Sequence, residues 1–218
     1  MSRPTRVEFG GATYYVSTHG NAQQRIWLAD CDRDDLFQVL EKTIARFGWI
    51  CHAYCLMPDH YHLVVETPHP NLSEGMRYLN WTYTQAFNRR YLRSGHLFRG
   101  RFEAVLVEKG TRLLEVARHV VLNPVRAELA RAAKDWPWSS YRATAGMAET
   151  PAYLTTGWIH DQFGGALPTA AELYREYVRR GRNVAVWDNL KDGVLLGSPQ
   201  FVRHLEPLVS PRPASRRA

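Results

Sequence analysis

The order of alternating and helical segments near the start of the chain constrains its fold more than any other feature. Residues 12–20 alternate in polarity and are rich in β-branched and aromatic side chains, which predicts a strand. Residues 32–48 carry apolar side chains at helical spacing, acidic residues at the start and a glycine at the end, which predicts a helix. Two further strands are predicted at 49–57 and 60–67, antiparallel to each other and joined by a short turn.

The same alternation of helix and strand continues along the chain. Residues 72–92 predict a long amphipathic helix, and residues 101–108 alternate as a fourth strand. The resulting order, β-α-β-β-α-β, is that of the ferredoxin-like split β-α-β arrangement. We therefore expect an α+β fold with a four-stranded antiparallel sheet and helices on one face.

The rest of the chain is predicted to be mainly helical. Residues 111–123 form one predicted helix, and a further helix is predicted to begin at Pro124 with Asn123 as its cap. The pattern then weakens, and later helices are predicted at 169–181 and 198–209. We divide the chain into a first domain of residues 1–145, a helical C-terminal extension of 146–209, and a Pro- and Arg-rich tail of 210–218 that we expect to be disordered.

The composition is that of a globular chain able to bury a core. Hydrophobic residues make up 45% of the 218 residues and charged residues 22%. No run approaches the roughly 18 apolar residues that span a bilayer, and the first residues lack the apolar core of a secretion signal. Three cysteines are too few for a disulfide framework, and Cys51 and Cys55 are expected to be core residues of a strand. We therefore expect a cytoplasmic protein without a membrane partner.

Basic charge gathers in one segment of the chain. The formal net charge is +7, and residues 77–101 contain six arginines, interleaved aromatic side chains and no acidic residue. Arginines contact phosphates and aromatic rings stack on bases, so this combination is typical of proteins that bind single-stranded nucleic acid. A solvated basic helix whose aromatic residues belong to the core would give the same pattern. The aromatic residues in question are Tyr78, Trp81, Tyr83, Phe87, Tyr91 and Phe98.

Two histidines stand at the start of the strand predicted at 60–67. Because side chains two positions apart share a strand face, His60 and His62 project together and Tyr61 points to the other face. Two adjacent imidazoles can chelate a divalent metal, although such pairs are also common as ordinary polar residues. Glu66 shares their face by alternation and either tunes such a site or ends the strand.

Several motifs, in order along the chain, resemble one protein family. MPDHYHLVVE (57–66) resembles the His-hydrophobe-His (HUH) motif of the single-tyrosine transposases of the IS200/IS605 type. Three later segments, 83–107, 118–130 and 135–143, are similar to successive motifs of the REP-associated tyrosine transposase branch. The resemblance covers about residues 5–145, so we expect the first domain to be an IS200-like transposase domain.

The resemblance implies a protein that cuts and rejoins single-stranded or hairpin DNA through a covalent phosphotyrosine intermediate. In this family two histidines and a third polar residue hold one Mg²⁺ or Mn²⁺, and the matching positions here are His60, His62 and Asn123. The resemblance leaves open a monomer or a homodimer. The residues expected to contact DNA are Arg77, Arg89, Arg90, Arg93, His96, Arg99 and Arg101.

The chain departs from the family at the position of the nucleophile. The family motif has a tyrosine after its arginine, whereas here His119 follows Arg118. His119 is therefore the candidate catalytic residue, either as a nucleophile or as a base that activates water. Alternatively, Tyr83 or Tyr91 on the preceding helix substitutes for it, or the protein is a DNA-binding regulator that no longer cuts.

Overall fold

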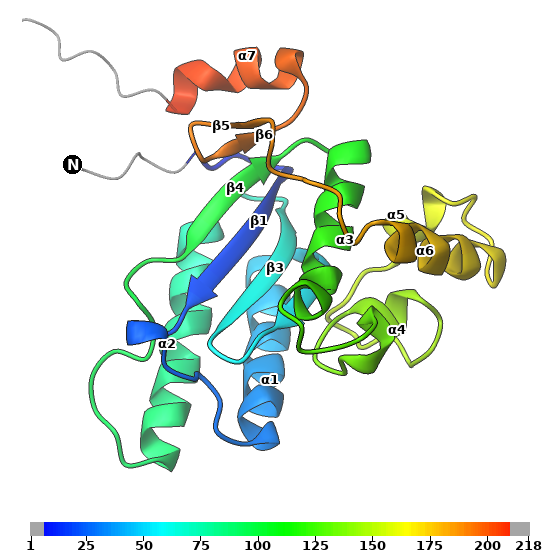
Figure 1. Cartoon of the computed structure of the whole chain (residues 1–218). Helices are drawn as coiled ribbons and strands as arrows, with labels where there is room; N and C mark the ends of the chain where they lie inside the picture. Colours follow the sequence, from blue (N-terminus) through cyan, green and yellow to red (C-terminus); the bar gives the residue numbers. More distant parts are fainter. Residues whose placement is uncertain (1–6, 210–218) are drawn as a thin grey trace, which may run out of the picture.

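The computed structural model describes residues 7–209, which form a six-stranded sheet with helices packed on it (Figure 1). The first part of the chain contains β1 (Ala12–His19), α1 (Asp30–Phe47), β2 (Ile50–Leu56), β3 (His60–Thr67), α2 (Leu72–Arg90), β4 (Glu103–Val107) and α3 (Thr111–Arg126). The second part contains α4 (Tyr141–Thr144), α5 (Gly157–Asp161), α6 (Thr169–Arg180), β5 (Leu190–Lys191), β6 (Leu195–Leu196) and α7 (Pro199–Val209). The disorder expected for the tail, residues 210–218, lies outside the described residues.

The sheet has the strand order β2-β3-β1-β4-β6-β5. β1 pairs antiparallel with both β3 and β4, and β2 pairs antiparallel with β3. The first four strands therefore have the predicted ferredoxin-like order, and the α+β class is confirmed. β6 extends the sheet by pairing in parallel with β4, and β5 pairs antiparallel with β6. These two strands are two residues long each, which is too short for an alternating pattern to predict them.

The two helices of the β-α-β-β-α-β unit, α1 and α2, lie on one face of the sheet as expected, and the next helix, α3, covers the other face. α1 and α2 lie side by side against one face, where Leu40 and Met76 join Leu63 in one buried cluster (Figure 1). α3 covers the other face, where Val120 joins Val64 in a second buried cluster. The crossover helices of this topology leave one apolar face of the sheet open, and the next helix in the chain buries it.

α3 continues through a proline at which the sequence predicted a break. Pro124 has no N–H to donate to the carbonyl of Val120, four residues earlier. The side-chain amide of Asn123 donates to that carbonyl instead, at 3.3 Å, and also to the carbonyl of His119 at 3.3 Å. The predicted new helix at Pro124 is therefore wrong, and Asn123 satisfies the last turn of α3 rather than capping another helix.

The C-terminal extension is helical over much of its length and also contributes β5 and β6 to the sheet. Its last helix is held by Glu108, whose carboxylate accepts hydrogen bonds from Ser198 N at 2.6 Å and Ser198 Oγ at 2.9 Å. Cys51 and Cys55 are buried core residues, as predicted. Within residues 7–209, none of the helices is both long and apolar enough to cross a membrane.

Candidate functional site

Three histidines lie together on the sheet face that α3 covers. His60 and His62 of β3 share this face as predicted, and their ring centroids are 4.7 Å apart. His19 of β1 pairs with His60 across the two strands, and its ring stacks on that of His60 with centroids 4.8 Å apart. Tyr61 points to the opposite face, where its hydroxyl donates to Asn80 Oδ1 of α2. The histidine pair therefore stands at one end of the sheet, beside a third imidazole.

Hydrogen bonds hold both rings of the pair through the same nitrogen. Nδ1 of His60 lies 2.6 Å from Oδ1 of Asp59, and Nδ1 of His62 lies 2.9 Å from Oη of Tyr15. Oriented in this way, each ring can offer Nε2 to a metal, because partners at Nδ1 fix the tautomer of a ligating histidine. Nε2 of His62 is buried and has no hydrogen-bond partner among the described residues.

The electrostatics of His62 favour a neutral ring. Burial, followed by the neighbouring imidazoles of His60, His119 and His19, lowers the pKa of His62 well below its ordinary value of 6.5. A neutral imidazole with an unpartnered, buried nitrogen is the form that binds a divalent cation. The pair therefore fits the metal that the sequence resemblance implied.

A third protein ligand is not assembled beside the pair. Within residues 7–209, no three side chains of His, Cys, Asp or Glu are grouped so that they could hold a metal ion. Asn123 uses its side-chain amide on carbonyls of its own helix, and the structure describes no contact between it and His60 or His62. Its role as the third ligand stays a prediction. Glu66 lies farther along β3, where it forms an ion pair with Lys109 at 2.7 Å.

His119 is enclosed by hydrogen-bond donors. Nη1 of Arg126 lies 2.9 Å from its Nδ1, and Nε1 of Trp187 lies 3.3 Å from its Nε2. Neither arginine nor tryptophan can accept a hydrogen bond, and a neutral imidazole has one acceptor nitrogen. Burial, followed by the Arg126 charge, lowers the pKa of His119 to about 4, so the ring is neutral near pH 7. In this structure His119 therefore has no lone pair free to attack phosphorus or bind a metal.

Tyr15 connects the histidine pair to His119 in a way that sequence reasoning missed. Its ring stacks on that of His62 at a centroid distance of 5.5 Å and meets the ring of His119 edge-on at 6.5 Å. Trp187, from the segment before β5, covers it at 4.8 Å. Strand alternation was a signal for Tyr15, which shares its face with Ser17 and His19. No sequence signal pointed to Trp187, because it reaches the site from the C-terminal extension.

A cavity of 450 Å³ opens on this face of the sheet. It runs from the histidines and Tyr15 to the β4 strand and the β5–β6 hairpin, and residues that line it include Tyr15, Ser17, His19, His62, Arg101 and Trp187.

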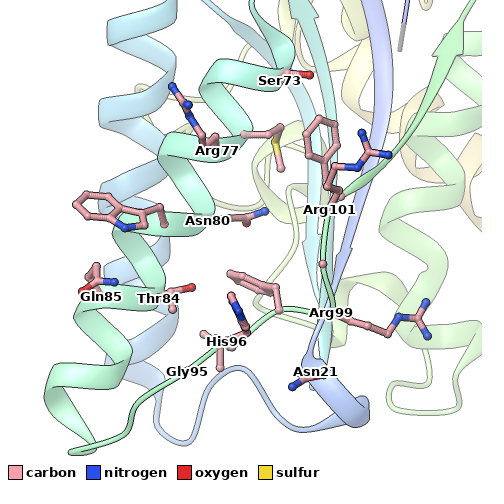
Figure 2. Close-up of a pocket in the computed structure, with 16 residues that line it drawn as sticks. Asn21, Ser73, Arg77, Asn80, Thr84, Gln85, Gly95, His96, Arg99 and Arg101 are labelled. Carbon is pink, nitrogen blue, oxygen red and sulfur yellow. The ribbon is translucent and has the colours of Figure 1, made fainter. Parts of the chain in front are cut away.

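A second, larger cavity of 990 Å³ lies between α2 and the segment before β4. Arg77, Asn80, Thr84 and Gln85 of α2 line one side of it, and His96, Arg99 and Arg101 line the other. Figure 2 shows Asn80 and Thr84 pointing towards the segment that carries His96, while Arg99 extends away from α2. We call this cavity the basic groove, because the described residues that line it include three arginines and no carboxylate. Arg101 and Phe102 line both cavities, so the basic groove adjoins the histidine face.

The predicted DNA-contacting residues divide into two groups. Arg77, His96, Arg99 and Arg101 line the basic groove. Arg90 instead pairs with Asp32 at 2.5 Å and Asp35 at 2.7 Å, which ties the end of α2 to the start of α1. Arg93 donates to Gln24 Oε1 at 2.7 Å, and Arg89 is exposed at the end of α2 outside the groove lining. A structural ion pair and a DNA-contacting arginine look alike in sequence, so the pattern could not separate them.

The interleaved aromatic residues belong almost entirely to the core. Tyr83, Phe87 and Phe98 are buried, and Tyr78 and Tyr91 pack partly buried against the same cluster. Trp81 differs from the other five, because it is 62% exposed and lines the basic groove.

The two alternative tyrosines lie away from the histidine face. Tyr83 is fully buried on the α1–α2 side, and its hydroxyl donates to the carbonyl of Ile26. The hydroxyl of Tyr91 donates to Oδ2 of Asp32 at 2.8 Å. Both hydroxyls therefore form hydrogen bonds within the layer of α1 and α2, on the side of the sheet opposite the histidines.

Comparison with known proteins agrees with this architecture. The sequence profile of the family described as "Transposase IS200 like" matches residues 12–120, half of the chain. The chain belongs to the IS200-like transposase family. A curated protein of Haemophilus influenzae (strain ATCC 51907 / DSM 11121 / KW20 / Rd), provisionally named a REP-associated tyrosine transposase, is 28% identical over 152 residues, covering 65% of this chain and 86% of that protein.

A solved structure shares the fold of this family member. It is the structure of a REP-associated tyrosine transposase bound to a REP hairpin, with a TM-score of 0.60 and 17% sequence identity. The match covers 71% of this chain and 92% of the solved chain. This match shows a shared fold, and the family suggested by the sequence motifs is confirmed by the sequence profile.

Proposed function

We propose that this protein binds hairpin DNA of the REP type with a single-stranded flank, and cleaves and rejoins that flank at the histidine face. The observation that carries the proposal is the junction of the two cavities. Because Arg101 and Phe102 line both, a strand held in the basic groove is led directly to His62. The name of the curated relative and the hairpin bound by the solved neighbour support the same class of DNA.

The basic groove supplies the chemistry that binding requires. Arg77, Arg99 and Arg101 line it and can contact phosphates, and no carboxylate belongs to its described lining. Arg99 forms an ion pair of 3.9 Å with the exposed Glu103, whereas Arg77 and Arg101 form none with the described residues. Trp81 presents an exposed ring on which an unpaired base can stack. Amide side chains such as Asn80 and Gln85 can accept and donate hydrogen bonds to base edges.

His60 and His62 would hold Mg²⁺ or Mn²⁺ through their Nε2 atoms, with Asp59 and Tyr15 orienting the two rings. When bound, such a cation polarises a phosphate oxygen and stabilises the charge that develops at phosphorus. Arg101, which lines both cavities, would hold the adjacent phosphate in place.

A second function, non-catalytic DNA binding by a regulator, is favoured by the surroundings of His119. Its nitrogens face Arg126 and Trp187, and it occupies the position of the family tyrosine. On this alternative, the groove and the histidine pair remain from a transposase, but strand cleavage has been lost.

Incubation with Mn²⁺ and a hairpin oligonucleotide labelled at both ends tests the proposal. We expect the wild-type protein to release a cleaved strand, and the double variant His60→Ala/His62→Ala to bind the oligonucleotide without cleaving it. Binding without cleavage by the wild type would select the regulator, and gain of cleavage in His119→Tyr would then show that only the nucleophile was lost. Absence of hairpin binding by the wild type would contradict both functions.

A further inference from the structure

We propose that Tyr15 is the nucleophile of this chain and takes the place of the tyrosine missing from α3. The inference rests on the proposed function, since it concerns how the flank of the bound hairpin is cleaved. It assigns the attack to a strand residue at the centre of the sheet, where the sequence suggested a residue of α2 or α3.

The placement of the Tyr15 hydroxyl carries the inference. Oη lies 2.9 Å from Nδ1 of His62, and Tyr15 and His62 line the same cavity. When Nε2 of His62 offers its lone pair to a metal, Nδ1 carries the proton and donates to Oη. The phenol proton of Tyr15 is then directed away from His62, and the oxygen is held beside the metal-binding imidazole.

The other groups that could attack are placed less well. Tyr15 is the only tyrosine among the described residues that line the cavity. The hydroxyls of Tyr83 and Tyr91 are bonded to Ile26 and Asp32, in the layer on the other side of the sheet. His119 faces two donors, as described above.

The cavity also provides a place for the scissile phosphate. Arg101 lines it together with Tyr15 and continues into the basic groove. Its guanidinium is exposed and forms no ion pair with any described residue, so it is available to a phosphate. His19, stacked on His60, completes the wall next to the pair. A phosphodiester held by Arg101 beside His62 therefore lies within the same space as the Tyr15 hydroxyl.

The step balances without any further reactant. The phenolic oxygen of Tyr15 forms a bond to phosphorus, and the bond from phosphorus to the 3′ oxygen of the preceding nucleotide breaks. The phenol loses its proton, and the departing oxygen gains one, by transfer through solvent, to leave as a 3′ hydroxyl. The phosphotyrosine ester preserves the phosphodiester energy, so attack by a 3′ hydroxyl reverses the step and rejoins the strand.

Mapping the covalent adduct tests this assignment. The full-length protein is incubated with Mn²⁺ and the hairpin oligonucleotide, denatured, and digested with trypsin. Cleavage after Arg6 and Arg25 gives a peptide that contains Tyr15. We expect this peptide to carry an acid-stable nucleotide adduct on Tyr15, and Tyr15→Phe to reduce adduct formation by at least about 10³-fold while hairpin affinity is retained.

Tyr14→Phe is the matched control. Tyr14 is the chain neighbour of Tyr15, belongs to the core cluster on the α1–α2 side, and donates its hydroxyl to the carbonyl of Val7. This variant should form the adduct as the wild type does, and it removes the second tyrosine from the tryptic peptide. An acid-labile adduct on His119, an adduct on any other residue, or hairpin binding with no adduct at all would overturn the inference. Binding without an adduct would leave the DNA-binding part of the proposed function intact.

Discussion

At the scale of single residues, the surroundings of His119 and Tyr15 differ. Both nitrogens of the imidazole on α3 face donors, on Arg126 and Trp187, whereas the phenol on β1 is hydrogen-bonded to His62 and lines a cavity. His62 contacts Tyr15 through one ring nitrogen and leaves the other unpaired: its Nδ1 is hydrogen-bonded to the Tyr15 hydroxyl, and its Nε2 has no described partner. The chemistry of the site thus depends on which nitrogen or oxygen retains an unused lone pair.

The neutral state of His119 predicts a pH dependence of stability. Its pKa is about 4 in the folded protein and about 6.5 in the unfolded chain, so only the unfolded chain takes up a proton between these values. The free energy of unfolding should therefore be unaffected by this group above pH 6.5 and fall as the pH decreases towards 4. The loss attributable to His119 is roughly 2–3 kcal/mol.

Denaturant unfolding in the presence of a chelator measures this effect. Other buried histidines, including His52 and His62, have lowered pKa values and also weaken the protein on acidification. His119→Gln should therefore retain part of the pH dependence and lose about 2 kcal/mol of it between pH 6.5 and 4. If the free energy of unfolding changed equally with pH in the wild type and in His119→Gln, the ring of His119 would not be held neutral in the folded protein.

Strand alternation alone predicted the shared face of His60 and His62, because a period of two depends only on the local backbone. The same reasoning applies to Tyr15, but its partner residues come from β3, α3 and the extension, and sequence spacing does not show which strands become neighbours. Arg90 illustrates a related limit. Its charge suggested DNA, whereas Asp32 and Asp35, more than fifty positions away, neutralise it in the fold.

At the scale of elements, hydrophobic periodicity predicted the long helices and strands, but it missed the continuation of α3 through Pro124 and the two short strands. Long strands and helices between residues 12 and 108 are all present, with ends that differ by at most two residues. α3 passed through Pro124 because the side chain of Asn123 replaced the missing backbone donor, which the general rule for proline does not anticipate. β6 depends on pairing with β4, and β5 depends on pairing with β6, and such tertiary contacts cannot be predicted from strands of two residues.

The packing of α2 against the sheet predicts the effect of one substitution. A Cβ on Gly75 would overlap the ring of Trp49, which is buried and held by a 2.8 Å hydrogen bond from its Nε1 to Asn71 Oδ1. Gly75→Ala should therefore lower the free energy of unfolding by about 1–3 kcal/mol, despite the better helix propensity of alanine. Chemical denaturation measures the difference.

Gly157→Ala provides the comparison for this variant. Gly157 begins α5, and a Cβ there would meet no described atom within 4 Å. The substitution should be neutral or stabilise the protein by up to about 1 kcal/mol. A Gly75→Ala variant as stable as Gly157→Ala would show that α2 can move away from Trp49 without cost.

At the scale of the whole molecule, the site is assembled from parts that lie far apart in the chain. β1 and β3 supply the phenol and the histidines, α2 and the segment before β4 supply the basic groove, and the extension closes the region around His119 through Trp187. The extension also completes the sheet through β6. This organisation explains why a strand bound between α2 and residues 95–102 would arrive at the histidine face.

A DNA interface in the basic groove is tested most directly by the affinity for a REP-type hairpin with a single-stranded flank, measured between about 50 and 200 mM salt. We predict tight, strongly salt-dependent binding by the wild type. The triple variant Arg77→Gln/Arg99→Gln/Arg101→Gln should bind about ten-fold or more weakly, with a slope of log affinity against log salt smaller by about 2–3.

A control with the same loss of charge is Arg179→Gln/Arg180→Gln/Arg203→Gln, whose positions are exposed on α6 and α7 away from the basic groove. It should retain nearly the wild-type affinity and slope. Equal losses in the two triple variants, or a wild-type affinity that does not change with salt, would contradict a DNA interface in the basic groove.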